Sequence, residues 1–355
     1  MDLLDPSTPR WYQVVRNVRN AMVMRSAMPK RVTIADLAKL LGIDKSSISL
    51  ALRDSPKMSL ATRARVQRAA REHNYTPNWA AKQLAGSTSH AIGLIMPSAF
   101  ACLTHPSVVH TIQALARLAA ARGLTLNLIA NEQLTARRDK PLLPLHADGL
   151  LVWGDVPALS ATWFSSAYAR PSIVLDPHHP SYARYAGSTI RIRNKEGAGA
   201  VVGHLHDRGA RHLTFVEVVR EHLGHEQRWR GTRQAWLERA SAETLRKIHI
   251  DELTDDDLSS VASRGDGAIF CSNDRGAMQV WHRLHRIGIS VPEQVKLAGF
   301  DGDEYGALVG LTTALFDSEA LAEKAFSGLQ KLMTKESERF GHESIPITVR
   351  IGTTS

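Results

Sequence analysis

Cysteine is scarce in this sequence of 355 residues, which contains only Cys102 and Cys271. Two cysteines cannot supply the disulfide framework of a small secreted domain, so a reducing cytoplasm is the expected location. No apolar run is long enough to span a bilayer, and the first residues lack the charged, apolar and small regions of a secretion signal. The sequence therefore predicts neither a membrane protein nor a secreted one.

Patterns typical of catalytic and metal sites are also missing. The sequence has no nucleophile elbow and no convincing catalytic triad. Its sixteen histidines have no Cys/His cluster beside them, so we expect surface histidines rather than metal ligands. The paired histidines are His178 with His179, His204 with His206, and His222 with His225. We therefore expect no enzymatic activity and no metal.

One glycine-rich run, GAGAVVG from Gly197 to Gly203, superficially suggests a nucleotide-binding loop. A dinucleotide-binding loop directly follows a strand and has an acidic residue further on. Here the polar run RNKE precedes the glycines. We predict that the run lies in or at the start of a helix, where its small residues permit close packing, and that it binds no cofactor.

Positive charge is concentrated at one end of the chain. The net charge of +9 arises from 44 Lys+Arg and 35 Asp+Glu. Residues 28–90 hold 11 basic and 4 acidic groups, residues 1–27 hold 4 and 2, and residues 91–355 hold 29 of each. A basic segment attached to a neutral body predicts a module that binds a polyanion such as nucleic acid.

The stretch VTIADLAKLLGIDKSSISLAL, Val32 to Leu52, has the pattern of two short helices joined by a tight turn. Thr33 can cap the first helix, with Asp36 three residues later, and Gly42 suits a left-handed helix end. Asp44 can cap the second helix. The expected buried residues of that helix are Ile48, Ala51 and Leu52, and its polar leading end consists of Lys45, Ser46 and Ser49. This is the pattern of a helix-turn-helix, whose second helix can reach phosphates and base edges.

Two further helices are expected after this motif. Ser59 can cap LATRARVQRAAREH, and Asn78 can cap the segment NWAAKQLAG, which ends at Gly86. The expected buried side of the longer helix consists of Val66, Ala69, Ala70 and His73. The shorter segment is too short to be a stable helix alone in water. An ordinary αα-hairpin would explain the first two helices, but it would not explain this continuation.

From Val32 to Gly86, the landmarks VTIADLA, SSISLAL, SLATRARV, NYTPN and QLAG occur in order. This region resembles the DNA-binding headpiece of the lac-repressor-type (LacI) family of transcriptional regulators. The resemblance places Leu84 where an apolar side chain enters the minor groove, in a hinge that folds on DNA. Many relatives have arginine where this chain has Leu50, so a different operator sequence is expected. The resemblance implies base or phosphate contacts by Lys45, Ser46 and Ser49, backbone contacts by Arg53 and Lys57, and further DNA contacts by Thr33, Ser47, Asn78 and Ala81.

After the hinge, apolar strands alternate with helical segments from AIGLIMP, residues 91–97, to VKLAGFD, residues 295–301. This alternation predicts parallel sheets covered on both faces, with too many units for one compact sheet. The resemblance implies two α/β lobes like those of a periplasmic sugar-binding protein, crossed three times by the chain. We place the first lobe at about residues 91–188 and 317–342, and the second at about 189–316 and 343–355.

The predicted fold is thus an N-terminal all-α helix-turn-helix headpiece with a hinge helix, followed by a two-lobed α/β periplasmic-binding-protein-like sensor domain. The headpiece is expected at residues 31–76, the hinge and linker at 77–90, and the sensor domain at 91–355. Residues 1–30 match no feature of the family that the chain resembles. Either translation begins at Met28, or these residues form a poorly ordered extension.

Three polar residues of the sensor domain are implied in effector binding by the same resemblance. Arg228 lies in RWRG, Asn273 in SND and Asp301 in GFDG. Ligands of open α/β sheets bind outside the carboxyl ends of the strands, where Asn273 and Asp301 are expected. The Arg228 guanidinium can donate to hydroxyls or carboxylates. The alternative is a structural ion pair between Arg228 and Asp301.

The sequence departs from the family pattern around this cleft. The segment IRIRN carries arginines where relatives commonly have an aspartate. Phe316 replaces a polar residue after LTT, and the proline that usually precedes LTT is absent. These differences favour a ligand other than the usual sugars, or no ligand.

The sequence therefore predicts a cytoplasmic, homodimeric transcriptional regulator, most simply a repressor. It would bind a pseudo-palindromic operator in double-stranded DNA and respond to a small molecule of unknown identity. A dimer is expected rather than a tetramer, because no apolar heptad tail follows ITVRIGTTS. A stand-alone small-molecule binding protein is the alternative, but it would need only the lobes and not the headpiece.

Overall fold

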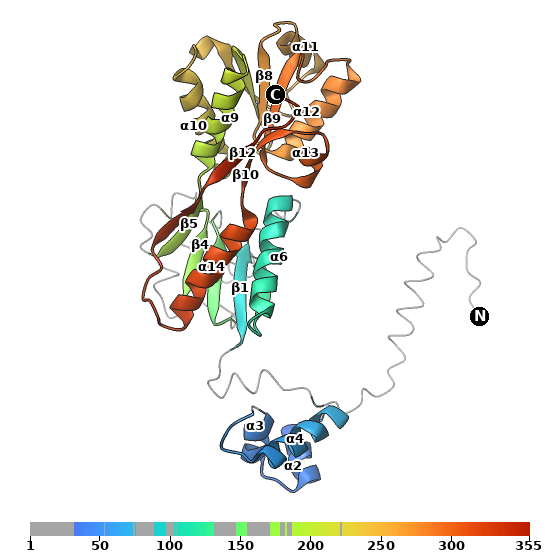
Figure 1. Ribbon diagram of the computed structural model, residues 1–355, viewed down its shortest axis with the longest axis vertical. Coiled ribbons are helices and arrows are strands. Elements are labelled where there is room, and N and C mark those ends of the chain that lie inside the picture. The colour runs from blue at the N-terminus through green and yellow to red at the C-terminus, as the bar shows by residue number, and fades with distance from the viewer. Residues whose placement is uncertain are drawn as a thin grey trace, which may run out of the picture. The chain divides into compact units, whose positions relative to one another are not determined.

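In the computed structural model the chain divides into two units, residues 1–88 and 89–355 (Figure 1). The residues with a described structure are 32–52, 54–73, 75, 89–96, 103, 105–130, 147–154, 171–177, 182, 187–220 and 222–355. The N-terminal extension, the hinge segment and the predicted DNA contacts Arg53, Asn78, Ala81 and Leu84 lie outside these ranges.

In the first unit, three helices pack around a small apolar core. They are α2 (Ile34–Leu41), α3 (Lys45–Leu52) and α4 (Leu60–Glu72). The buried core residues are Leu37, Ile48, Ala51, Val66, Ala69 and Ala70. The helices α2 and α3 form the predicted helix-turn-helix, and α4 packs against both. One expectation is wrong: His73 is exposed, because it is the C-cap residue of α4 and not part of its buried side.

Local hydrogen bonds set the helix ends as the sequence predicted. Thr33 Oγ1 accepts the backbone N–H of Asp36 at 3.3 Å, and the Asp36 carboxylate accepts the N–H of Thr33 at 2.9 Å. Together these two bonds complete a capping box at the start of α2. Gly42 ends α2 with a φ of 64°, a left-handed conformation that glycine adopts without strain. The hydroxyl of Ser59 caps α4.

The second unit contains two mainly parallel sheets, with strand orders β11-β5-β4-β3-β1-β2 and β12-β10-β9-β8-β6-β7. The first sheet consists of β1 (Ala91–Met96), β2 (Thr125–Ala130), β3 (Gly149–Trp153), β4 (Ser172–Leu175), β5 (Ser188–Ile192) and β11 (His342–Ile345). The second consists of β6 (His212–Glu217), β7 (Leu245–His249), β8 (Gly267–Cys271), β9 (Val295–Asp301), β10 (Thr312–Phe316) and β12 (Ile347–Arg350). The strand β12 pairs antiparallel with β10.

Helices cover these sheets, as the predicted alternation requires. On the first sheet, α6 (Pro106–Ala120) and α14 (Ser318–Met333) lie side by side (Figure 1). One face of the second sheet packs against α9 (Asn194–Asp207) and α10 (Leu223–Leu237), and the other against α11 (Asp255–Ala262) and α12 (Asp274–Arg286). The short α13 (Glu304–Leu308) and the 3-10 helix η3 (Ala242–Thr244) complete this lobe. None of the helices in the described ranges is long and apolar enough to cross a bilayer.

The chain crosses between the two lobes three times. The crossings follow β5, β10 and β11, at Arg193, Asp317 and Pro346. The second matches the predicted return near Asp317. The boundary predicted near Ser188 is too early, because β5 pairs with β4 and β11 in the first sheet. The final boundary is also too early, since all of β11 belongs to the first lobe.

The helix α9 contains the glycine-rich run, as predicted, and packs closely against α10. A Cβ atom on Gly231 of α10 would lie 2.1 Å from the backbone oxygen of Lys195. Only glycine permits this approach of two helix backbones. A Cβ atom on Gly197 would lie 2.6 Å from Cγ2 of Ile347 in β12. These glycines therefore serve the packing of α9 against its neighbours.

Candidate nucleic-acid interface and ligand site

The helix α3 has a buried side and a polar leading end. Ile48 and Ala51 are fully buried in the core of the first unit and fix the orientation of the helix. Lys45 and Ser46 in the first turn are exposed, and Ser49 is half-buried. The exposed turn can therefore enter a groove of DNA while the buried side holds the helix in place.

Asp44 caps α3 and organises this leading end. Its carboxylate accepts the backbone N–H of Ser47 at 2.9 Å and the hydroxyl of Ser46. The hydrogen bonds from the side chains of Ser46 and Ser47 hold the pKa of Asp44 well below its usual range. The leading end therefore carries a carboxylate at Asp44 beside the ammonium group of Lys45.

Exposed basic side chains are spread over the first unit. Of the predicted DNA contacts, Lys57 and Thr33 are also exposed, and Ser47 is half-buried. Arg63 is tied to Asp54 by an ion pair of 2.9 Å. Among the described residues of this unit, Lys39, Lys45, Arg65, Arg68 and Arg71 also have exposed basic side chains. Together these charges attract a polyanion to this unit.

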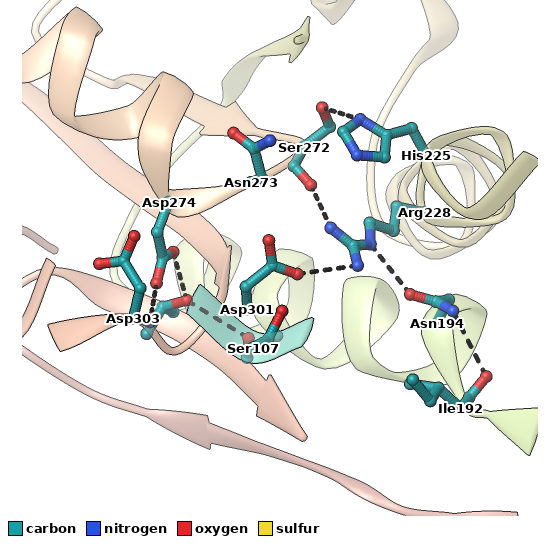
Figure 2. Close-up of polar contacts among 12 residues, drawn as sticks. Ser107, Ile192, Asn194, His225, Arg228, Ser272, Asn273, Asp274, Asp301 and Asp303 are labelled. Carbon is teal, nitrogen blue, oxygen red and sulfur yellow. Dashed lines mark hydrogen bonds and ion pairs between the residues drawn. The ribbon is translucent and has the colours of Figure 1, made fainter. Parts of the chain in front are cut away.

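In the second unit, Arg228 is the centre of a buried polar network (Figure 2). Its Nη2 lies 2.9 Å from Oδ1 of Asp301. Its Nε donates to Oδ1 of Asn194 at 2.9 Å, and its Nη1 donates to the carbonyl oxygen of Ser272 at 2.6 Å. The guanidinium also lies over the Phe300 ring, 3.7 Å from the centroid. Arg228 of α10 is thus held by groups from the start of α9 and from the ends of β8 and β9.

Asp301 ends β9 in an unusual backbone conformation. Its φ of 111° lies in the left-handed region that favours glycine, so the residue is strained. Burial raises the pKa of Asp301, and the positive charge of Arg228 opposes that rise. The ion pair that the sequence offered as an alternative is therefore present. A ligand that binds Arg228 or Asp301 must either form hydrogen bonds in addition to this ion pair or replace one of its partners.

Asn194 connects the network to the first lobe. Its Nδ2 donates to the carboxylate of Asp176 at 3.3 Å, and that carboxylate also accepts the N–H of Ile192 at 2.9 Å. Asp176 follows β4 of the first sheet, whereas Arg228 and Asp301 belong to the second lobe. A chain of hydrogen bonds therefore runs from one lobe, through Asn194, to the ion pair in the other.

One histidine of the predicted surface set, His225, lies beside Arg228 and is not at the surface, whereas His222 is exposed. His225 is buried, and its Nδ1 forms a hydrogen bond of 2.8 Å with the Ser272 hydroxyl. Burial, reinforced by the charge of Arg228, lowers the pKa of His225 well below its ordinary value. The ring of His222 lies 4.7 Å from the ring of His225. No group of three or more potential metal ligands occurs among the described residues.

Asn273 and Asp274 follow β8 and begin α12. The side chain of Asn273 caps this helix, but its buried Nδ2 has no hydrogen-bond partner in the part of the chain that the structure describes. A buried donor of this kind can be satisfied by a ligand. Asp274 accepts the hydroxyl of Thr313 at 2.6 Å and the N–H of Asp303 at 2.8 Å. Burial, together with the nearby Asp301 charge, raises the pKa of Asp274 to about 8.

A cavity of about 760 Å³ borders the network on the side of Asp301. Its lining includes Ser107 from α6, Asp303, and Pro346 at the last crossing. Phe316, which replaces the family's polar residue, also lines it and packs into the core of the first lobe. The volume is within the range of small-molecule pockets.

Comparison with known proteins accounts for both units. Residues 33–78 match the family model described as bacterial regulatory proteins, lacI family, and residues 202–355 match that of a periplasmic binding protein-like domain. The chain therefore combines a DNA-binding region of lacI-family type with a periplasmic-binding-protein-like domain. This confirms the resemblance found in the sequence and the two-part architecture that it implied.

Curated relatives and solved structures match this chain over most of its length. The HTH-type transcriptional repressor PurR of Aliivibrio fischeri (strain MJ11) is 25% identical over 340 residues, which cover 89% of this chain and 96% of PurR. The lac repressor dimer bound to operator and the anti-inducer ONPF has a TM-score of 0.74 at 20% identity, covering 92% of this chain and 99% of that one. The regulator CelR in complex with cellobiose has a TM-score of 0.62 at 19% identity, covering 92% and 100%.

Proposed function

We propose that this protein is a transcriptional repressor that binds a pseudo-palindromic operator as a homodimer. The observation that carries the proposal is one chain that joins a helix-turn-helix, with an exposed leading end, to a two-lobed ligand-binding fold. The relatives named as repressors, and the lac repressor dimer bound to operator, support the same partner and assembly. Such a regulator would act on DNA in the cytoplasm without catalytic activity.

On the DNA side, each headpiece would place α3 in a major groove. Lys45, Ser46 and Ser49 would contact bases or phosphates, and Lys57 would contact the backbone. The hinge contact of Leu84 in the minor groove remains a prediction, because that residue lies outside the described part of the chain. Two-fold symmetry of the dimer then requires two inverted half-sites.

In the second unit, Arg228, Asn273 and Asp301 would bind the effector. Arg228 and Asp301 offer a donor and an acceptor, and Asn273 has a buried donor to satisfy. The hydrogen bonds through Asn194 would convey a change at Arg228 to the first lobe. Sugar acids are the first ligands to test, because Arg228 suits carboxylates and Asp301 suits hydroxyls. Neutral sugars such as cellobiose, with which CelR is solved, serve as the comparison, since the segment IRIRN and Phe316 disfavour the usual sugars.

Salt dependence tests the DNA-binding part of this proposal. For a dimer that makes on the order of 6–10 phosphate contacts, the DNA affinity should fall ~10³- to 10⁵-fold between about 50 and 200 mM salt. The loss follows from the release of counterions by the basic side chains of the headpiece. Fluorescence anisotropy of labelled duplex DNA measures it directly. Affinity that hardly changes over this range would count against the proposal.

A further inference from the structure

The leading end of α3 carries two groups whose hydrogen-bonding roles are fixed within the protein. Asp44 is ionised, because hydrogen bonds from Ser46 and Ser47 hold its pKa well below the usual range. An ionised carboxylate can only accept hydrogen bonds. The hydroxyl of Ser46 has a single proton and donates it to Asp44. The remaining sites on the Ser46 oxygen are therefore acceptors as well.

The position of Asp44 and Ser46 gives their fixed role as hydrogen-bond acceptors a consequence for DNA binding. Both Asp44 and Ser46 are exposed, at the end of the helix that corresponds to the DNA-reading helix of a helix-turn-helix. In the major groove, adenine N6 and cytosine N4 are donors, whereas guanine N7 and O6 and thymine O4 are acceptors. Protein acceptors pair with the amino groups and are repelled by the base acceptors. The neighbouring Lys45 has only donors, so it suits a phosphate or a guanine.

We propose that the Asp44–Ser46 pair makes this protein select adenine or cytosine, through the exocyclic amino group, at one position of each operator half-site. The inference rests on the proposed function, because it assigns a base preference to that DNA interface. Ser46 is the contacting residue. Asp44 is a positioning residue, which holds the Ser46 proton away from the DNA and adds negative charge beside it.

The test is selection of DNA sites from a random pool by the full-length protein and three variants. Ser46→Ala removes the acceptor, and Asp44→Asn keeps a good helix cap while replacing the carboxylate by a neutral amide that can also donate. The matched control is Asp54→Asn, which also removes one negative charge from the headpiece but at an exposed residue paired with Arg63. Circular dichroism of each variant verifies that its helices are intact.

The unaltered protein should discriminate against guanine and thymine at one half-site position by roughly 5- to 150-fold. Ser46→Ala should abolish that discrimination, and Asp44→Asn should relax it or shift it toward guanine and thymine. Asp54→Asn should tighten binding to all sequences alike and leave the base preference unchanged. If Asp44→Asn unfolds the headpiece, Ser46→Ala still decides the question, since Ser46 does not cap the helix.

Two contrary results have different meanings. If the unaltered protein selects a symmetric site and Ser46→Ala selects the same site with the same base preferences, the inference is overturned and the proposed function stands. If the unaltered protein enriches no sequence, both the proposed function and this inference are wrong.

Discussion

Arg228→Ala is expected to lower the free energy of unfolding of the second unit by about 3–5 kcal/mol, because it leaves the buried Asp301 carboxylate without its partner. It also removes the hydrogen bonds to Asn194 and to the carbonyl of Ser272. Response to a ligand should disappear as well. Binding of DNA should persist while the second unit remains folded, since the headpiece is a separate compact unit. Differential scanning calorimetry of the full chain measures the loss of stability.

A double variant separates the two roles of Arg228. Replacing both partners, Arg228→Met with Asp301→Asn, leaves no unpaired buried charge and keeps at position 301 a residue that tolerates the positive φ, so it should recover most of the lost stability. Ligand response, measured as the shift in melting temperature with a panel of sugars and sugar acids, should not recover. A double variant that regains both stability and the unaltered protein's ligand shifts would show that the pair is structural only.

Leu37→Ala should have the second largest effect, a loss of about 2–5 kcal/mol from the stability of the headpiece. Leu37 is fully buried in the core that α2, α3 and α4 share. A unit of this size buries little apolar surface and has little stability to lose. The headpiece should therefore unfold, and specific DNA binding should be lost, while the melting of the second unit is unchanged.

Leu60→Ala is the matched control for this change. It removes the same atoms from the same unit, but Leu60 is 76% exposed at the start of α4. Its effect on stability should stay within about 0.5 kcal/mol. Fluorescence anisotropy with operator DNA and limited proteolysis of the headpiece measure both variants. Leu37→Ala protein that binds DNA as tightly as the unaltered protein would mean that this core does not hold α3 in place.

The headpiece could be predicted from the sequence because its determinants are local. The capping box of Thr33 and Asp36 and the left-handed Gly42 act within a few residues of each other. The buried positions of α3 and α4 follow the helical period, except at the helix ends, where Leu52 is only half-buried and His73 is exposed. Each feature could therefore be predicted without knowledge of distant contacts.

The polar network around Arg228, which is the candidate ligand site, could be predicted only in part. Arg228 and Asp301 were found through the resemblance to the family, and strand ends are recognisable positions. Their partners were missed, because Asn194 and the Ser272 carbonyl lie 34 and 44 residues from Arg228 in the sequence. His225 was misplaced at the surface for the same reason, since its hydrogen-bond partner is 47 residues away.

The errors at element boundaries have similar causes. The first lobe boundary was placed too early because β5 completes its sheet with β11, a strand from the far end of the chain. The start of α10 at Leu223 is also hard to recognise in the sequence. Its cap is the side chain of His222, which is outside the Ser, Thr, Asp and Asn group that marks most helix starts.

Selection of bound sequences from a random pool of double-stranded DNA, with the full-length protein at physiological salt, shows whether two copies of the chain read an operator. We expect enrichment of one site with two inverted half-sites, bound by two copies of the chain. We also expect that Leu37→Ala protein enriches no site, because α3 is then no longer held by its core. Recovery of no preferred sequence by the unaltered protein, or of a site without two-fold symmetry, would contradict the account of this chain as a dimeric operator-binding regulator.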